Sequence, residues 1–147
     1  MKTYFDPPVA EELLERLARF HPASPRQWGH MELPQMLAHC SASLRMILGE
    51  LPVKPVPARF IGWLFKGVIT SETPFRHGVP TAREFTVAES RELEAERAIL
   101  GSAMARLATG PEAIHSFRHP FFGRLSSAQW GQLVYKHLDH HFRQFGG

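Results

Sequence analysis

The stretch from Trp130 to Phe145 carries the pattern that most restricts the fold of this chain. Apolar side chains recur there at helical spacing and fall on one arc. His137 and His141 lie on the same arc, one helical turn apart. A polar ring without a partner is costly on an apolar face, so this pair needs an explanation. The segment predicts an amphipathic helix with two histidines facing the interior.

Three other segments show comparable periodicity, and several helix ends among the four segments are recognisable. Asp6 is a suitable N-cap with Pro7 in the first turn, Gly49 can close a second helix, and Ser126 and Gln129 form a capping-box pattern. The expected long helices run from Pro7 to a stop at Pro22, from about Leu33 to Leu48, from about Glu89 to Ala108, and from Ser126 to Phe145. In the third of these, the residues expected to face inward are Leu93, Ile99, Leu100, Met104 and Leu107.

The middle of the chain is rich in proline and glycine. Prolines bracket a short helix expected from about Ala58 to Val68, and the turn-rich stretch from Thr70 to Val87, with Pro74, Gly78 and Pro80, is expected to wrap over the surface. No segment shows convincing strand alternation. The sequence therefore predicts one all-α domain over residues 1–147, a helical bundle with an extra short helix and a Pro-rich connecting segment.

Composition excludes several classes of protein. The formal charge of +3 is mild, and basic residues are scattered among acidic ones, so no nucleic-acid partner is expected. No stretch reaches the roughly 18 apolar residues of a membrane span. The single cysteine, Cys40, allows no internal disulfide and is expected to be a buried small side chain. We expect a cytoplasmic protein without a membrane partner.

Two histidines at this spacing can hold one metal ion, but a site needs at least one further protein ligand. His39, on the second predicted helix, is the best candidate, because its neighbours on that face adjoin the apolar arc. Together, His39, His137 and His141 would leave coordination positions open, which is typical of a catalytic rather than a structural site.

Alternatives to this metal site stay open at the level of sequence. A lone histidine such as His39 on an apolar helix face is more often a core residue bonded to a backbone carbonyl. His140 could pair with His137 at a spacing of three, although a flanking role fits its direction better. His140 and His119 are the candidate catalytic general bases, and neither is favoured strongly by its spacing.

Three stretches of the sequence resemble the DinB/YfiT-like superfamily, and in particular a bacterial branch known mainly as domains of unknown function. They are residues 28–40 (WGHMELPQMLAHC), 119–125 (HPFFGRL) and 135–146 (YKHLDHHFRQFG). The resemblance implies an up-down-down-up four-helix bundle with a divalent metal near one end. Carried over to this chain, the family's ligands are His39, His137 and His141. The Pro-rich segment from Leu51 to Val87 departs from the simplest members.

Characterised relatives of that superfamily include transferases and isomerases that use low-molecular-weight thiols. The expected function is therefore that of a metal-dependent enzyme that binds zinc, nickel or iron and acts on a small-molecule substrate. Its expected chemistry is that of a transferase or isomerase with a low-molecular-weight thiol as cosubstrate, or that of a hydrolase. The chemistry rests on the analogy with the family. The alternative is a non-catalytic bundle that binds a metal or small molecule, as a homodimer formed through exposed apolar helix faces.

Overall fold

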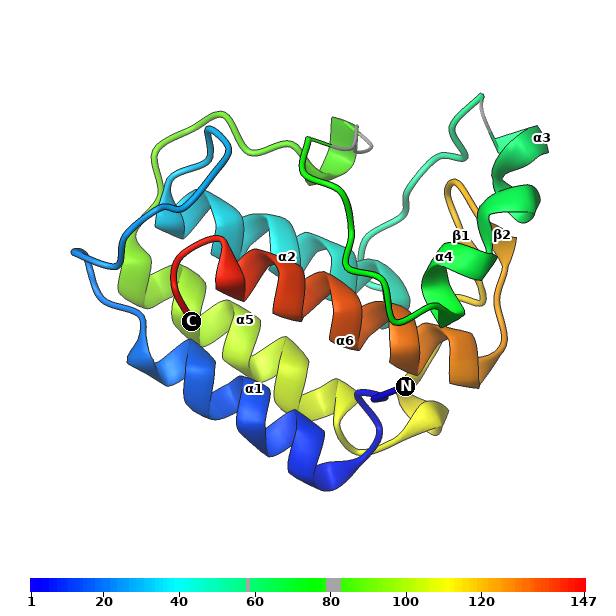
Figure 1. The fold of residues 1–147 in the computed structure, drawn as a ribbon, viewed down its shortest axis with the longest axis horizontal. Coiled ribbons are helices and arrows are strands. Elements are labelled where there is room, and N and C mark those ends of the chain that lie inside the picture. The colour runs from blue at the N-terminus through cyan, green and yellow to red at the C-terminus, as the bar shows by residue number, and fades with distance from the viewer. Residues whose placement is uncertain (58, 79–82) are drawn as a thin grey trace.

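The computed structural model describes residues 1–57, 59–78 and 83–147 and is mostly helical, as predicted. Its four long helices, shown in Figure 1, are α1 (Pro7–Arg19), α2 (Leu33–Ile47), α5 (Leu93–Leu107) and α6 (Ser127–Arg143). Helices α2 and α5 pack together, α1 contacts α5 and α6, and α2 contacts α6. In Figure 1, α2 and α5 run one way along the molecule, whereas α1 and α6 run the opposite way.

Local sequence signals mark several ends of the long helices. Helix α6 opens with the predicted capping box, in which the amide of Gln129 donates to Ser126 Oγ and the amide of Ser126 donates to Gln129 Oε1, at 3.2 and 3.0 Å. Helix α1 begins at Pro7 after Asp6, although the Asp6 side chain makes no capping hydrogen bond. Gly49 follows α2 with a φ of +76°, a conformation that glycine adopts without strain.

Two details of the helix prediction are wrong. Helix α5 begins at Leu93, four residues after the expected start at Glu89, because residues 89–92 are all polar and exposed, so no core contact holds them in the helix. Ile99, predicted to face inward, is 44% exposed. The buried face of α5 is instead formed by Glu96, Leu100, Ala103, Met104 and Leu107.

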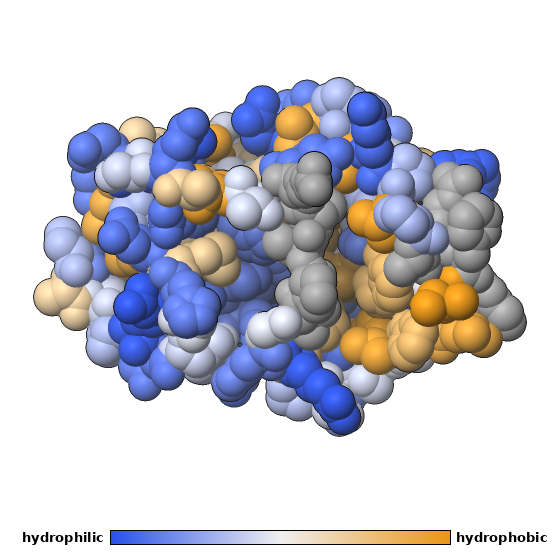
Figure 2. Space-filling model, turned by 90° about the horizontal axis from the view of Figure 1, so that it is seen from above, coloured by the Kyte–Doolittle hydropathy of each residue, from blue (hydrophilic) through white to orange (hydrophobic). Residues whose placement is uncertain are grey.

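The Pro-rich segment does not form one short helix. It contains α3 (Arg59–Gly62), the 3-10 turn η1 (Trp63–Phe65) and α4 (Gly67–Thr70). Ala58, the expected start, and Pro80 lie outside the described residues. Figure 2 shows apolar side chains gathered over this part of the surface, where Ile61, Leu64, Phe65 and Val68 are exposed.

The remaining elements are short: η2 (Arg83–Phe85), η3 (Pro111–Ala113), β1 (Arg118–His119) and β2 (Gly123–Arg124). Strands β1 and β2 pair antiparallel, with Arg118 opposite Arg124 and His119 opposite Gly123. The sequence predicts no strands here, because two-residue strands are too short to show alternation. This hairpin leads directly into α6.

The core lies between the long helices and includes the completely buried Met36, Leu44, Leu100, Trp130 and Phe142. Tyr4 closes one end of it, where its hydroxyl donates to the Met104 carbonyl at 2.8 Å. None of the described helices is both long enough and apolar enough to cross a membrane. The packing of α2 on α6 brings the predicted histidines of both helices to one interior position.

Candidate metal centre

His39, His137 and His141 meet between α2 and α6. One ring nitrogen from each lies within 4.8 Å of the others. The Nε2 atoms of His39 and His137 are 3.0 Å apart, and the His141 ring centroid is 4.7 Å from that of His39 and 4.8 Å from that of His137. The structure thus brings together the three residues that the sequence predicts as metal ligands.

The backbone of η2 fixes the tautomer of His39. This side chain is 5% exposed, and its Nδ1 lies 2.9 Å from the Phe85 carbonyl oxygen. A carbonyl oxygen only accepts hydrogen bonds, so Nδ1 carries the proton. Consequently, Nε2 of the neutral ring presents a lone pair to the cluster.

Ser43, one turn after His39 on α2, fixes the tautomer of His137. Its hydroxyl donates to the Cys40 carbonyl at 2.8 Å, so its oxygen is left to accept from His137 Nδ1, which lies 3.2 Å away. The Nε2 of His137 is therefore also an acceptor. Metal-ligating histidines usually donate their other ring N–H to an oxygen, and Ser43 supplies that oxygen for His137.

Gln144 has the corresponding role for His141. Its Nε2 donates to the Trp28 carbonyl at 2.9 Å, which orients Oε1 toward His141 Nδ1 at 3.0 Å. Gln144 is 3% exposed, and this orientation of its amide follows from its two partners. The third ring thus also has its proton on Nδ1 and its lone pair on Nε2.

These three tautomers leave two lone pairs facing each other across 3.0 Å, at His39 and His137. Buried acceptors without a donor are destabilising, and a shared proton or a cation would satisfy them. Tetrahedral zinc with Zn–N bonds of about 2.0–2.1 Å separates its ligand nitrogens by roughly 3.3–3.4 Å. That separation lies between the 3.0 Å pair and the 4.8 Å limit of the cluster. The donor set therefore fits a divalent transition metal ion.

The electrostatics of the cluster keep all three rings neutral, which is the form that binds metals. Burial lowers the pKa of His39, despite its hydrogen bond to the Phe85 carbonyl. Burial, followed by the charges of neighbouring histidines, lowers the pKa of His137 well below its usual value. Burial likewise lowers the pKa of His141 to about 3. None of the three needs to lose a proton at neutral pH.

His140, a predicted catalytic base, lies beside the cluster rather than in it. Its ring centroid is 5.1 Å from that of His141, and it is 5.6 Å from Trp28 and 5.7 Å from His77. Burial lowers its pKa. His140 lines a surface pocket next to the histidine cluster, together with Trp28 and His77.

His119, the second predicted catalytic residue, lies in the β-hairpin. Its Nδ1 accepts from the amides of Phe121 and Phe122, at 3.1 and 3.2 Å, so its Nε2 carries the proton. Burial lowers its pKa to about 4, and its charge would in turn lower the pKa of His137. Its ring packs against Trp130, at 5.7 Å between centroids.

The residues that orient the three imidazoles are not among those predicted from the sequence. Gln144 follows His141 by three residues, so helical spacing could have suggested it. Ser43 lies on the same face of α2 as His39, but its contact with His137 of α6 depends on tertiary packing. The Phe85 carbonyl gave no signal, because a backbone group from a distant turn is invisible in a pattern of side chains.

The fold and the site together define a helical protein with three neutral, pre-oriented imidazoles at one interior position. By comparison with family models, the chain belongs to the family described as "Protein of unknown function (DUF1569)", whose model matches residues 9–146. That span includes all the residues of the cluster and their hydrogen-bond partners. Neither the curated proteins nor the solved structures contain a match to this chain.

Proposed function

We propose that His39, His137 and His141 bind one divalent transition metal ion, and that the protein is a metal-dependent enzyme acting on a small-molecule substrate. The observation that carries this proposal is the close approach of two Nε2 lone pairs, 3.0 Å apart, in rings whose other nitrogens are already satisfied. Zinc, nickel and iron all suit nitrogen ligands.

The finer fold is part of the same proposal. The opposed directions of the long helices and their contacts are those expected of the up-down-down-up bundle of the DinB/YfiT-like superfamily. The motifs around His39 and His137 that resemble this superfamily overlap α2 and α6, the two helices that supply the cluster. By that resemblance, the substrate class includes low-molecular-weight thiols.

Three protein nitrogens leave coordination positions for a substrate, as in catalytic rather than structural sites. A divalent ion there supplies Lewis acidity, which lowers the pKa of a coordinated water or thiol. The protein's own contribution is to hold the three lone pairs in place through the Phe85 carbonyl, Ser43 and Gln144.

The two catalytic candidates have different roles in this proposal. His140 is neutral at physiological pH and borders the pocket beside the cluster, so it serves as a proton acceptor. His119 already uses its acceptor nitrogen on two amides, and its remaining N–H makes it a hydrogen-bond donor rather than a general base.

Metal analysis of protein purified without an affinity tag tests the site directly. The wild-type chain should hold about one equivalent of a divalent metal, and His137→Ala and His141→Ala should lower this below about a tenth. His21→Ala, at an exposed histidine outside the cluster, is the matched control. A wild-type protein without metal, or metal content indifferent to the cluster variants, would contradict the proposal.

The enzymatic part needs a separate test. Cobalt-substituted protein should change its visible spectrum when a thiol is added, because open positions accept further ligands. A spectrum that no thiol or small anion perturbs would instead indicate a saturated, non-catalytic metal site.

A further inference from the structure

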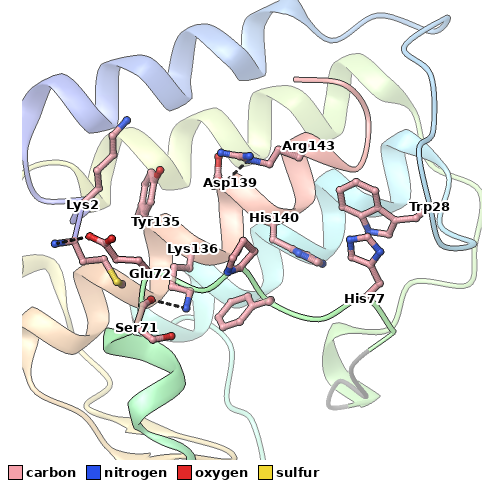
Figure 3. Close-up of a pocket in the computed structure, with 13 residues that line it drawn as sticks. Lys2, Trp28, Ser71, Glu72, His77, Tyr135, Lys136, Asp139, His140 and Arg143 are labelled. Carbon is pink, nitrogen blue, oxygen red and sulfur yellow. Dashed lines mark hydrogen bonds and ion pairs between the residues drawn. The ribbon is translucent and has the colours of Figure 1, made fainter.

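A pocket of about 420 Å³ lies on the side of α6 next to the histidine cluster. Figure 3 shows it between α6 and the segment from Ser71 to His77. From α6 it is lined by Tyr135, Lys136 and His140, and it is closed on other sides by Trp28, Phe75 and His77. His140 is the link to the cluster, since its ring is 5.1 Å from that of His141.

Lys136 is unusual for a lysine because it is only 7% exposed. Its ammonium donates to the carbonyls of Val68 and Ser71, the latter at 2.9 Å, and lies 4.7 Å from the centroid of the Phe75 ring. Among the described residues, no carboxylate forms an ion pair with it.

The carboxylates that line the pocket are committed or turned to solvent. Asp139 is bound by Arg16 at 2.8 Å and by Arg143 at 2.9 Å. The Glu72 side chain is 85% exposed and pairs with the N-terminal ammonium of Met1 at 3.8 Å. A buried ammonium is stabilised best by an anion, and two carbonyls occupy only two of its three hydrogens. The wall of the pocket therefore carries a cation that lacks an anionic partner.

The other walls offer flat aromatic faces. Trp28 and His77 are stacked, with ring centroids 4.1 Å apart and planes at 8°. The His140 ring lies 6.1 Å from Phe75 and 5.7 Å from His77. Aromatic faces with a few fixed polar groups are typical of sites for small organic molecules.

We propose that this pocket binds a small organic anion, whose carboxylate or phosphate group pairs with Lys136 and whose apolar part contacts the aromatic walls. Binding of the anion does not require a metal. Its assignment as the substrate, with the reacting end directed past His140 toward the cluster, rests on the proposed function.

Titrations of benzoate, phenyl phosphate and neutral benzyl alcohol test the proposal, with the indole N–H resonance of Trp28 as the NMR readout. Both anions should shift this resonance saturably, and benzyl alcohol should bind at least about tenfold more weakly, a difference of about 1.4 kcal/mol. The stronger of the two anions indicates whether a carboxylate or a phosphate is preferred.

Two variants assign the effect to Lys136. Lys136→Met keeps the length of the side chain and should weaken anion binding at least about tenfold. Lys66→Met is the matched control, because the Lys66 ammonium also donates to a backbone carbonyl, that of Arg124, but does not line the pocket. Anion binding by Lys66→Met should equal that of the wild type.

Ser71→Asp tests the same role of Lys136 in a second way, in case Lys136→Met fails to fold. It places a carboxylate next to the ammonium, so it should keep or raise the Tm while abolishing anion binding. Equal affinity for benzoate and benzyl alcohol, or anion binding unchanged in both Lys136→Met and Ser71→Asp, would overturn the proposal. Metal content measured on the same samples reports on the proposed function separately.

Discussion

Gln144 offers the sharpest test of how the histidine cluster is oriented. Its amide joins His141 Nδ1 to the Trp28 carbonyl, at 3.0 and 2.9 Å, and it is 3% exposed. Gln144→Met keeps the length of the side chain and removes both hydrogen bonds. His141 would then be free to rotate or to move its proton to Nε2, where it would block metal binding.

The magnitudes follow from the contacts that are lost. Removing the oxygen that orients a metal-ligating histidine typically weakens metal affinity by about 10–100-fold, or about 1.4–2.8 kcal/mol. Without metal, the variant should be destabilised by about 2 kcal/mol, because the buried ring N–H loses its acceptor while the Trp28 carbonyl, in a loop, can turn to water.

Competition with a chromophoric chelator measures the affinity, and urea unfolding in EDTA measures the stability. Gln132→Met, within α6 and about two and a half turns before His141, is the matched control. If Gln144→Met loses stability but binds metal within about threefold of the wild type, the proposed role of Gln144 in fixing the His141 tautomer is refuted, because loss of an orienting oxygen should weaken affinity by more than this.

Three further predictions concern protonation, a second orienting group and packing. The free energy of unfolding, measured with urea in EDTA, should fall by about 2 kcal/mol from pH 7 to pH 5 because of His141 alone. The pKa of His141 is about 3 in the folded chain and about 6.5 in the unfolded chain, so protons bind preferentially to the unfolded chain. A stability that stays constant or rises over this range would contradict the prediction. Ser43→Ala should weaken metal affinity by about tenfold in the chelator assay. The control is Ser41→Ala, which should leave the affinity unchanged, because the Ser41 hydroxyl donates to the Leu37 carbonyl and not to a histidine of the cluster. Equal effects of the two variants would contradict the proposed role of Ser43. Gly131→Ala should lower the free energy of unfolding in urea by about 1–3 kcal/mol, because the added Cβ would lie 2.1 Å from Thr3 Oγ1. An unchanged unfolding midpoint would contradict this, since it would mean that the N-terminal segment moves aside at no cost.

Lys136 shows where the helical pattern misleads. The periodicity of α6 puts it on the polar arc with Asp139 and Arg143, which predicts a solvated face. The structure buries it instead, because α4 packs against α6 and supplies the carbonyls of Val68, within α4, and of Ser71, directly after it. Asp139, on the same arc, is likewise bound by Arg16 of α1. The local sequence around α6 encodes neither of these contacts.

The hairpin and the Pro-rich segment were the least predictable parts. Pairing of Arg118 with Arg124 involves too few residues for any period to emerge. The break of the expected helix into α3, η1 and α4 depends on packing against the hairpin, where a Cβ at Gly62 would lie 1.9 Å from the Phe121 carbonyl oxygen. Such a close approach of two backbones is a tertiary property.

The sequence by itself determined the four long helices and the direction of His137 and His141, because helix caps and a 3.6-residue period act between near neighbours. It could name His39 but not place it, since 98 residues separate it from His137. Only the packing of α2 on α6 decided that the two Nε2 atoms meet. Only the approach of the Phe85 carbonyl decided which nitrogen of His39 presents its lone pair, because a tautomer depends on whatever the fold brings to the other side of the ring.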